Sequence, residues 1–250
     1  MRFAFTEEQD ELRRQARALL DEREPTWGEL AELGWLGVSV PEEAGGAGLG
    51  FVEEAVLFEE LGRALYPGPY FATVALAVPG LPPDEQARVA GGELQFEVDD
   101  ISLDDPAVRT RAFAALAAEA VGIAHKALEL AIDYAATREQ FGKPIGVYQA
   151  VSHPIVDTYV ETELARSLTY WAAWCVAEGD EQATMAALAA KSYAAEAAVA
   201  ASERSIQVHG GIGFTWEHPL HRYYKRAQWI EAFGGYPAKQ RAEIVASLLA

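Results

Sequence analysis

The sequence has a single cysteine, Cys175, among its 250 residues. One cysteine excludes a disulfide within the chain and is typical of a reducing compartment. The chain also lacks any run of about 18 apolar residues, the length that a membrane-spanning helix needs. Residues 1–6 lead directly into charged residues, so no secretory signal is visible. We therefore expect a cytoplasmic protein with no membrane span.

Positive charge is scarce as well. The 20 lysines and arginines are outnumbered by 38 aspartates and glutamates, and the net charge is −18. A nucleic-acid-binding protein needs a basic face, so we exclude nucleic acid as a partner. The histidines form no zinc-ligand pattern beyond the loosely spaced His218 and His221, so we expect no metal site. Any polyanionic ligand would need a local cluster of positive charge.

Strand signals are nearly absent, whereas helical periodicity is widespread. Only residues 94–98 alternate like a strand, and this segment is too short to form a sheet alone. Proline and glycine interrupt the pattern over residues 79–106, which marks the best domain boundary. Apolar residues recur at helical spacing in segments 7–20, 26–33, 51–65, 70–78, 107–137, 150–178, 181–208 and 237–249. The pattern predicts an all-α fold whose C-terminal half is a bundle of long antiparallel helices.

Two short segments carry possible ligand-binding chemistry. In residues 137–145, Arg138 supplies a planar cation for phosphate and Phe141 a flat surface for a ring. In residues 206–214, Gly210 and Gly211 allow close approach of the backbone, whose amides can hold a pyrophosphate. The alternative is that the glycines only cap a helix and that Arg138 is a solvated charge. Spacing alone favours this alternative.

The same two segments resemble signatures of the acyl-CoA dehydrogenase family. The sequence ATREQFGKPI (residues 136–145) is similar to the first signature, and QVHGGIGF (residues 207–214) to the second. Their surroundings, residues 121–149 and 191–226, resemble the family's C-terminal helical domain. The resemblance implies FAD as the cofactor and α,β-dehydrogenation of an acyl-CoA as the reaction.

The resemblance also covers the N-terminal half and exposes two departures. The sequence GWLGVSVPEE (residues 34–43), Gly45-Gly46 and EELG (residues 59–62) resemble the family's N-terminal helical domain. Family members normally carry a β-domain in the middle, which contacts the flavin ring, but almost nothing occupies that place here. We therefore expect an N-terminal helical domain at residues 1–93, a short linker at 94–106 in place of the β-domain, and a C-terminal four-helix-bundle domain at 107–250.

The second departure concerns the catalytic base. Family members carry a glutamate near the C-terminus, and alignment of the segment that starts at Tyr224 places Gly234 at this position. Glycine cannot accept a proton, so we expect no catalytic residue there. The other known position of the base falls near Ala112. Glu231 could substitute if its loop shifted, although a solvated helix-end charge is favoured, and Glu119 could be either a polar core residue or an exposed one.

In the family, the retained signatures reach into the flavin of a neighbouring subunit. The resemblance therefore implies that six residues contact the ADP half of a partner's FAD: Arg138, Gln140, Phe141, Gln207, Gly210 and Gly211. The sequence is interpreted as a half-site subunit, inactive alone, whose partner is a full-length acyl-CoA dehydrogenase-like chain. Analogy with heteromeric members suggests a sterol side-chain or other bulky acyl-CoA. The alternatives are a scaffold subunit without flavin and a self-sufficient flavoenzyme with a rearranged site.

Overall fold

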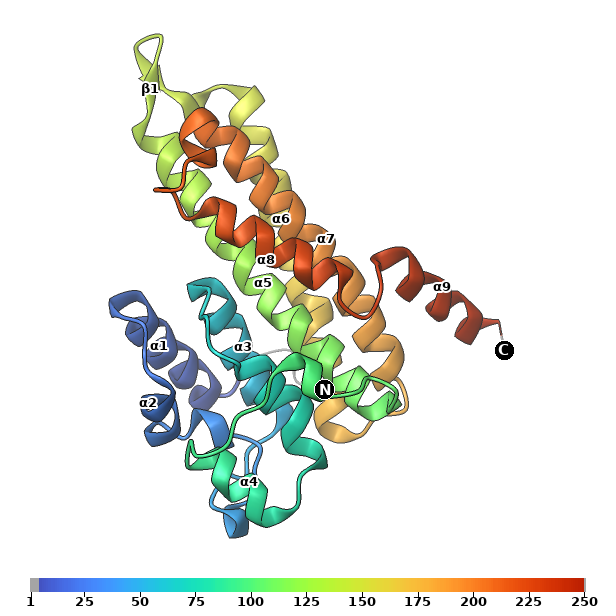
Figure 1. The fold of residues 1–250 in the computed structure, drawn as a ribbon. Coiled ribbons are helices and arrows are strands. Elements are labelled where there is room, and N and C mark those ends of the chain that lie inside the picture. The colour runs from blue at the N-terminus through green and yellow to red at the C-terminus, as the bar shows by residue number, and fades with distance from the viewer. Residues whose placement is uncertain (1–4, 250) are drawn as a thin grey trace.

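The computed structural model describes residues 5–249 of the chain. The N-terminal helices gather at one end of the molecule (Figure 1). They are α1 (Glu7–Glu22), α2 (Trp27–Glu32), α3 (Phe51–Ala64) and α4 (Pro83–Ala90), with short helical turns at Trp35–Gly37, Glu42–Ala44, Phe71–Ala77, Val78–Gly80 and Val98–Asp100. The predicted buried helix at residues 70–78 is present as the π-helical turn Phe71–Ala77, and all seven of its residues are buried.

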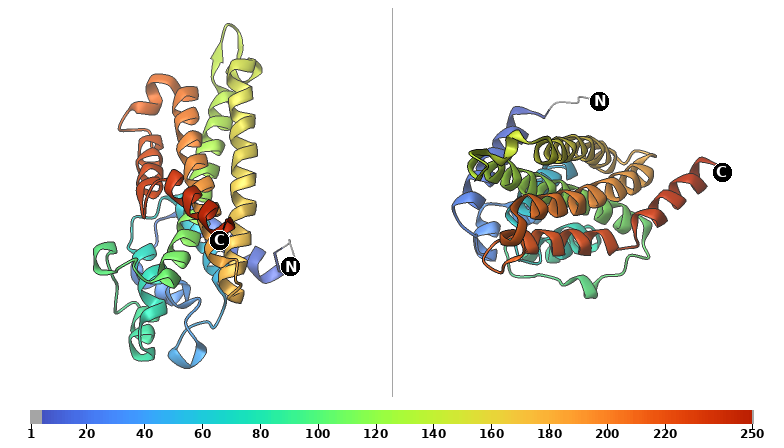
Figure 2. Two further views of the ribbon diagram at one scale, coloured as in Figure 1. Left: turned by 90° about the vertical axis from the view of Figure 1, so that its right-hand side faces the viewer. Right: turned by 90° about the horizontal axis from the view of Figure 1, so that it is seen from above.

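Long helices form the rest of the chain. They are α5 (Pro106–Thr137), α6 (Gln149–Glu178) and α7 (Ala183–His209), followed by α8 (Leu220–Ala232) and α9 (Pro237–Leu248), with short turns at Ile145–Val147 and Gly210–Phe214. α5, α6 and α7 run side by side, α8 lies along them, and α9 leads away to the C-terminus (Figures 1 and 2). Within residues 5–249 the only strands are the two-residue β1 (Glu139–Gln140) and β2 (Lys143–Pro144). The predicted all-α class and the loss of the middle β-domain are confirmed.

One hydrophobic core joins the two groups of helices. α3 lies so close to α5 that a Cβ on Gly122 would fall 1.9 Å from the carbonyl oxygen of Glu59, and one on Gly62 2.3 Å from that of Glu119. No other residue has so small a side chain, so these two glycines permit the backbone contact. The division into domains at residues 1–93 and 107–250, with a linker at 94–106, remains a prediction. The main core cluster includes residues from both predicted domains.

Local sequence signals explain the helix starts. Thr6 and Gln9 form a capping box at the start of α1, and Thr26 with Glu29 forms another at α2. The glycine-rich segment 36–50 lies between α2 and α3 and contains no strand. Within residues 5–249 no helix combines the length and the apolar character needed to cross a membrane. Cys175 is buried on α6, and burial raises the pKa of its thiol.

Two features differ from the sequence prediction. Residues 94–97 form no strand, because there is no neighbouring strand to pair with. Instead the backbone N–H of Phe96 donates to Oγ1 of Thr73 at 3.0 Å. α8 was not among the predicted helices. It is held by tertiary contacts, including the hydroxyl of Tyr223, which donates to the carbonyl oxygen of Arg63 at 2.8 Å.

Candidate functional site

The two sequence motifs meet at one end of the helix bundle. α5 and α7 run in the same direction, so the segments that follow them lie together, and the β1–β2 hairpin projects beyond this end (Figure 2). The ring of Tyr134 on α5 stacks on that of His209 on α7, with centroids 4.4 Å apart and planes 26° apart. The Nδ1–H of His209 donates to the carbonyl oxygen of Ser205 at 2.8 Å, which fixes the imidazole. The stack fixes the first motif relative to the second.

The hairpin presents Phe141 at its tip. Gln140 pairs with Lys143, so the turn between them consists of Phe141 and Gly142. Both residues have left-handed backbones, with φ of +52° and +75°, as a type I′ turn requires. This conformation costs a non-glycine residue on the order of 1 kcal/mol, yet the Phe141 side chain is 91% exposed and contributes little burial in return. The packing of this chain therefore does not explain why a phenylalanine occupies the turn.

Three polar residues among the six predicted FAD contacts also lie at the hairpin end of the bundle. Arg138 ends α5, where its N–H donates to the carbonyl oxygen of Tyr134 at 2.8 Å. Its guanidinium is exposed, and no carboxylate of the described residues lies within 4.0 Å of it. The side chain of Gln140 donates to the carbonyl oxygen of Glu139, and Gln207 is exposed on the last turn of α7. Arg138 is therefore available to a ligand from outside the chain.

The structure explains the glycine at position 210 but not the one at position 211. Gly210 caps α7 through its N–H, with φ of +61° and ψ of −137°, a conformation that is open mainly to glycine. The helix-cap interpretation thus accounts for Gly210. It does not account for Gly211, whose φ is ordinary and whose added Cβ would meet nothing within 4 Å. No packing contact within the described residues therefore requires a glycine at position 211.

The position predicted for the catalytic base is closed. Gly234 has φ of +67°, and an added Cβ would lie 2.5 Å from Cε1 of Phe113. Further aromatic rings fill the adjoining space, since Phe233 lies 5.4 Å from Phe71 and 5.0 Å from Trp229 between ring centroids. A glutamate at this position would lack both a suitable backbone and room for its side chain.

A buried lysine holds this closed segment in place. Nζ of Lys191, on α7, donates to the carbonyl oxygens of Glu231 at 2.9 Å and Gly235 at 2.8 Å. The side-chain amide of Gln240 donates to the same Gly235 oxygen at 2.6 Å. Burial lowers the pKa of Lys191 to about 8. The sequence did not point to Lys191, because a lysine in an alanine-rich helix is usually a solvated charge.

The other positions that the sequence offers for a catalytic base are those of Glu231, Glu119 and Ala112. Burial raises the pKa of the Glu231 carboxyl, and the nearby charge of Glu196 adds to the effect. Glu119 is neither free nor in the apolar core: it accepts two hydrogen bonds from Arg226, at 2.6 and 2.9 Å. Ala112, the alternative base position, is fully buried.

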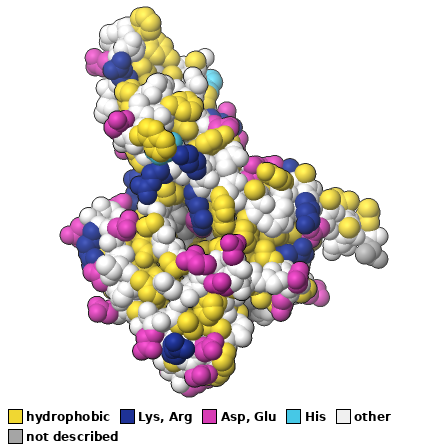
Figure 3. Space-filling view, in the orientation of Figure 1, with side chains coloured by type: hydrophobic (Ala, Val, Ile, Leu, Met, Phe, Trp, Pro, Cys, Tyr) yellow, Lys and Arg dark blue, Asp and Glu magenta, His cyan; other side chains and the backbone are white. Residues whose placement is uncertain are grey.

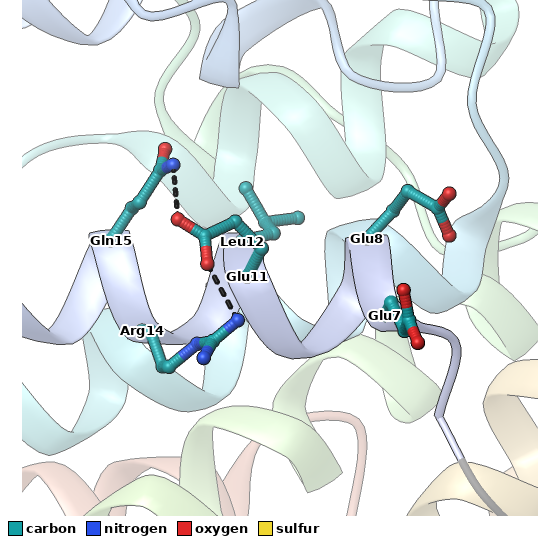
Figure 4. A pocket seen from close by; sticks show the side chains of 6 residues that line it. All are labelled: Glu7, Glu8, Glu11, Leu12, Arg14 and Gln15. Carbon is teal, nitrogen blue, oxygen red and sulfur yellow. Dashed lines mark hydrogen bonds and ion pairs between the residues drawn. The ribbon is translucent and has the colours of Figure 1, made fainter.

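A shallow groove on α1 provides no comparable site (Figure 4). It is lined by one helix face, with Glu7, Glu8 and Leu12 among its residues. Its polar groups bind each other, since Glu11 accepts from Gln15 at 2.6 Å and pairs with Arg14 at 2.6 Å. In the described part of the chain, no group of three histidine, cysteine, aspartate or glutamate side chains is arranged to hold a metal ion.

Two family models match the chain. Residues 9–81 match the family description "Acyl-CoA dehydrogenase, N-terminal domain", and residues 111–249 match "Acyl-CoA dehydrogenase, C-terminal domain". The two matches lie on either side of residues 82–110, where the β-domain is missing.

Individual relatives extend the comparison. The chain is 33% identical to acyl-CoA dehydrogenase IpdE2 of Mycobacterium tuberculosis over 82% of this chain and 80% of that protein. It is 32% identical to acyl-CoA dehydrogenase FadE34 of the same organism, over 84% of this chain and 40% of that protein. Among solved structures, the "Tcur3481-Tcur3483 steroid ACAD G363A variant" aligns with a TM-score of 0.86 and 27% identity, covering 97% of this chain and 98% of that one. The ChsE4-ChsE5 complex of M. tuberculosis shares the fold, with a TM-score of 0.85 and 23% identity, covering 100% of this chain and 99% of that one.

Proposed function

The chain belongs to the acyl-CoA dehydrogenase family, and we propose that it is a half-site subunit of a heteromeric, FAD-dependent member. In this assembly the chain contributes contacts to the ADP half of a flavin that a full-length partner holds. The observation that carries the proposal is a contrast within one molecule. The cross-subunit motif is exposed and intact, whereas the position of the chain's own base is blocked by Phe113.

Each retained residue has a defined task in the shared site. The guanidinium of Arg138 is suited to a bidentate contact with a phosphate oxygen pair. Phe141 offers its exposed ring to the adenine, and the open backbone at Gly211 gives room for the pyrophosphate. Gln140 and Gln207 supply amide groups on the same surface. FAD, when bound, accepts the hydride, while the partner's glutamate would remove the α-proton of the thioester.

Two relatives support a partner and a substrate class. The ChsE4-ChsE5 and Tcur3481-Tcur3483 structures are both named as pairs of different chains, and the latter is named a steroid enzyme. By this analogy, the substrate of the complex is a bulky acyl-CoA such as a steroid side-chain thioester. Because the space beside Gly234 is filled, the acyl chain would be bound by the partner and not by this chain.

The test is to purify the chain with its full-length partner and to measure flavin absorbance and turnover. Arg138→Ala should lower both the flavin retained by the complex and the rate of dehydrogenation. Arg14→Ala is the matched control, since it removes an arginine that is 70% exposed on α1 and remote from the hairpin end. If Arg138→Ala left flavin content and turnover at the level of the control, the shared site would be refuted.

The same preparation separates the two alternative functions. A scaffold subunit would give a stable complex that contains no flavin. A self-sufficient flavoenzyme would give a yellow homo-oligomer when the chain is expressed alone. The half-site proposal expects a colourless chain alone and a yellow complex.

A further inference from the structure

Three large apolar side chains are exposed within five residues of the segment that joins α7 to α8. Ile212, Phe214 and Trp216 have exposed fractions of 49%, 75% and 80%. Single exposed apolar residues are common on soluble proteins, whereas several large ones in one short segment point to a binding surface. None of the three belongs to the six residues that are expected to contact FAD. The 212–216 segment therefore has exposed side chains that the flavin contacts do not explain.

Hydrogen bonds hold the 212–216 segment in an ordered turn. The backbone N–H and the hydroxyl of Thr215 both donate to the carbonyl oxygen of Ile212, at 3.1 and 3.0 Å. The backbone N–H of His218 donates in turn to the carbonyl oxygen of Thr215 at 3.3 Å. The His218 ring lies 4.5 Å from that of His209 between centroids, which ties the segment to the end of α7. The exposed side chains are thus carried by a fixed backbone.

The Trp216 ring is also positioned, although most of it is exposed. Nζ of Lys225 lies 4.6 Å from its centroid, and the ring of His221 lies 4.8 Å away at an interplanar angle of 73°. Both contacts come from α8, and they orient the indole without burying it. A ring that is already held in place loses little conformational freedom when it binds. Tryptophan is also enriched among the interface residues that dominate affinity.

The charge beside the segment is opposite in sign to that of the whole chain. Residues 210–225 contain two basic residues, Arg222 and Lys225, and a single acidic one, Glu217, whereas the net charge of the chain is −18. Both basic side chains are exposed, and no carboxylate of the described residues lies within 4.0 Å of either. Figure 3 shows basic, histidine and hydrophobic side chains next to one another near the start of α8. A complementary surface would be apolar at its centre and acidic at its rim.

This charge pattern disfavours a second copy of the chain as the occupant. In a two-fold contact the same patch lies on both subunits, so Arg222 and Lys225 of one copy would face their equivalents in the other. An anionic membrane surface is disfavoured too, because the net charge of −18 opposes its approach. A different protein with an acidic rim fits the pattern better.

The position of the segment points to one such protein. Trp216 is five residues from Gly211, so their Cα atoms are at most about 18 Å apart. A standard interface covers about 800 Å² on each chain, which is a patch roughly 30 Å across. A chain that presents a flavin at Gly211 would therefore reach the 212–216 segment as well.

We propose that the 212–216 segment is a docking surface for the full-length partner, with Trp216 as its anchor in an apolar pocket and Arg222 and Lys225 against an acidic rim. The proposal rests on the heteromeric assembly proposed above, and it adds the contact by which this chain recognises its partner. The docking residues differ from the flavin contacts, so substitutions can separate the two roles.

The affinity between the two chains tests the anchor. The probe is the full-length acyl-CoA dehydrogenase-like chain that copurifies with this one on coexpression, titrated at saturating FAD. Trp216→Ala should raise the Kd by about tenfold or more, and Trp216→Phe by less, because phenylalanine keeps part of the apolar contact. Tyr159→Ala is the control, since it removes an exposed ring from α6, which lies on the opposite side of the bundle from α8 (Figure 2). A Kd for Trp216→Ala equal to that of the wild type or of the control would overturn the proposal. Circular dichroism and thermal unfolding verify the fold of each variant.

Flavin content separates the docking surface from the shared flavin site. At chain concentrations that saturate the complex, Trp216→Ala should retain as much flavin as the wild type, whereas Arg138→Ala should retain less. Loss of flavin from the saturated Trp216→Ala complex would make the ring a flavin contact and overturn its role as an anchor. If Arg138→Ala kept all of its flavin while Trp216→Ala still weakened the complex, the shared site would fail and the docking surface would stand. Loss of flavin in Arg138→Ala with an unchanged Kd in Trp216→Ala would have the opposite meaning.

Further measurements test the charge pattern and the other occupants. Arg222→Gln/Lys225→Gln should slow association and reduce its salt dependence more than Arg14→Gln/Lys239→Gln, which removes the same charge from exposed positions elsewhere. Equal effects of the two double variants would overturn the acidic rim. Self-association of the chain alone, or binding to vesicles of phosphatidylcholine and phosphatidylglycerol, would overturn the choice of partner if Trp216→Ala abolished it. A wild-type chain that bound no full-length homologue would overturn both proposals.

Discussion

The stacked rings of Tyr134 and His209, 4.4 Å apart, connect the last turn of α5 to the last turn of α7. Each of the two family signatures begins within a few residues of one of these rings. The relative position of Arg138 and Gly211 therefore depends on a contact between residues that are 75 positions apart in the chain. This contact lies within a single chain.

Removal of the stack should weaken the flavin contact. Tyr134→Ala removes an aromatic pair worth about 0.5–1.5 kcal/mol and lets the end of α5 move relative to α7. We expect the complex to retain severalfold less flavin after gel filtration, with unchanged helix content by circular dichroism. Tyr159→Ala is the control, because Tyr159 is 56% exposed on α6. Equal flavin retention in the two variants would show that the stack does not organise the site.

Phe141→Asn should separate stability from function at the hairpin. Asparagine tolerates the left-handed backbone at this turn better than phenylalanine, so the hairpin should gain about 0.5–1 kcal/mol. The same change removes the exposed ring and should lower flavin retention by the complex. Amide hydrogen exchange across β1 and β2 reports the first effect, and flavin absorbance the second. A variant that was more stable and held flavin fully would show that the ring is not a ligand contact.

Gly234→Glu should not create an active enzyme. The new side chain meets Phe113 at a backbone position where only glycine is unstrained, and we expect a loss of about 2–4 kcal/mol in the free energy of unfolding. Urea denaturation measures the loss, and an acyl-CoA dehydrogenation assay of the chain alone should give no turnover. Turnover by the single variant would contradict the closed site.

Lys191 should give the protein a pH-dependent term in stability. Its pKa in the folded state is about 8, below the 10.5 of an ordinary lysine, so the unfolded chain binds the proton more tightly between these values. The contribution of Lys191 to the free energy of unfolding should therefore rise as pH increases from about 8 to about 10.5. Lys191→Met lacks this contribution, although it also leaves two carbonyl oxygens without their donor. The difference in unfolding free energy between wild type and variant should change across this range, and a constant difference would contradict the lowered pKa.

The sequence predicted the helices and the exposed motif because both depend on local patterns. Apolar spacing identified α5, α6, α7 and α9, and the two signatures identified the segments that meet at the hairpin end of the bundle. It missed α8, although the buried Leu220, Tyr223, Ala227 and Ile230 recur at helical spacing along it. Long-range contacts such as that of Tyr223 with Arg63 add to the stability of this helix.

Only part of the arrangement at the base position could be predicted from the sequence. Gly234 was visible in the sequence as the loss of a carboxylate, but the ring that fills its place comes from Phe113, about 120 residues earlier. The hydrogen bonds of Lys191 to the carbonyl oxygens of Glu231 and Gly235 depend likewise on how distant helices meet. No local pattern encodes such contacts.

The burial of Cys175 has a practical consequence for the assembly. With its only thiol enclosed in α6 and its thiolate disfavoured, the folded chain should resist maleimide reagents. A cysteine introduced at the exposed Gln140 would then be the sole site for attachment of a dye. Energy transfer or quenching between that dye and the flavin would measure the distance from the hairpin to the flavin that the partner chain holds.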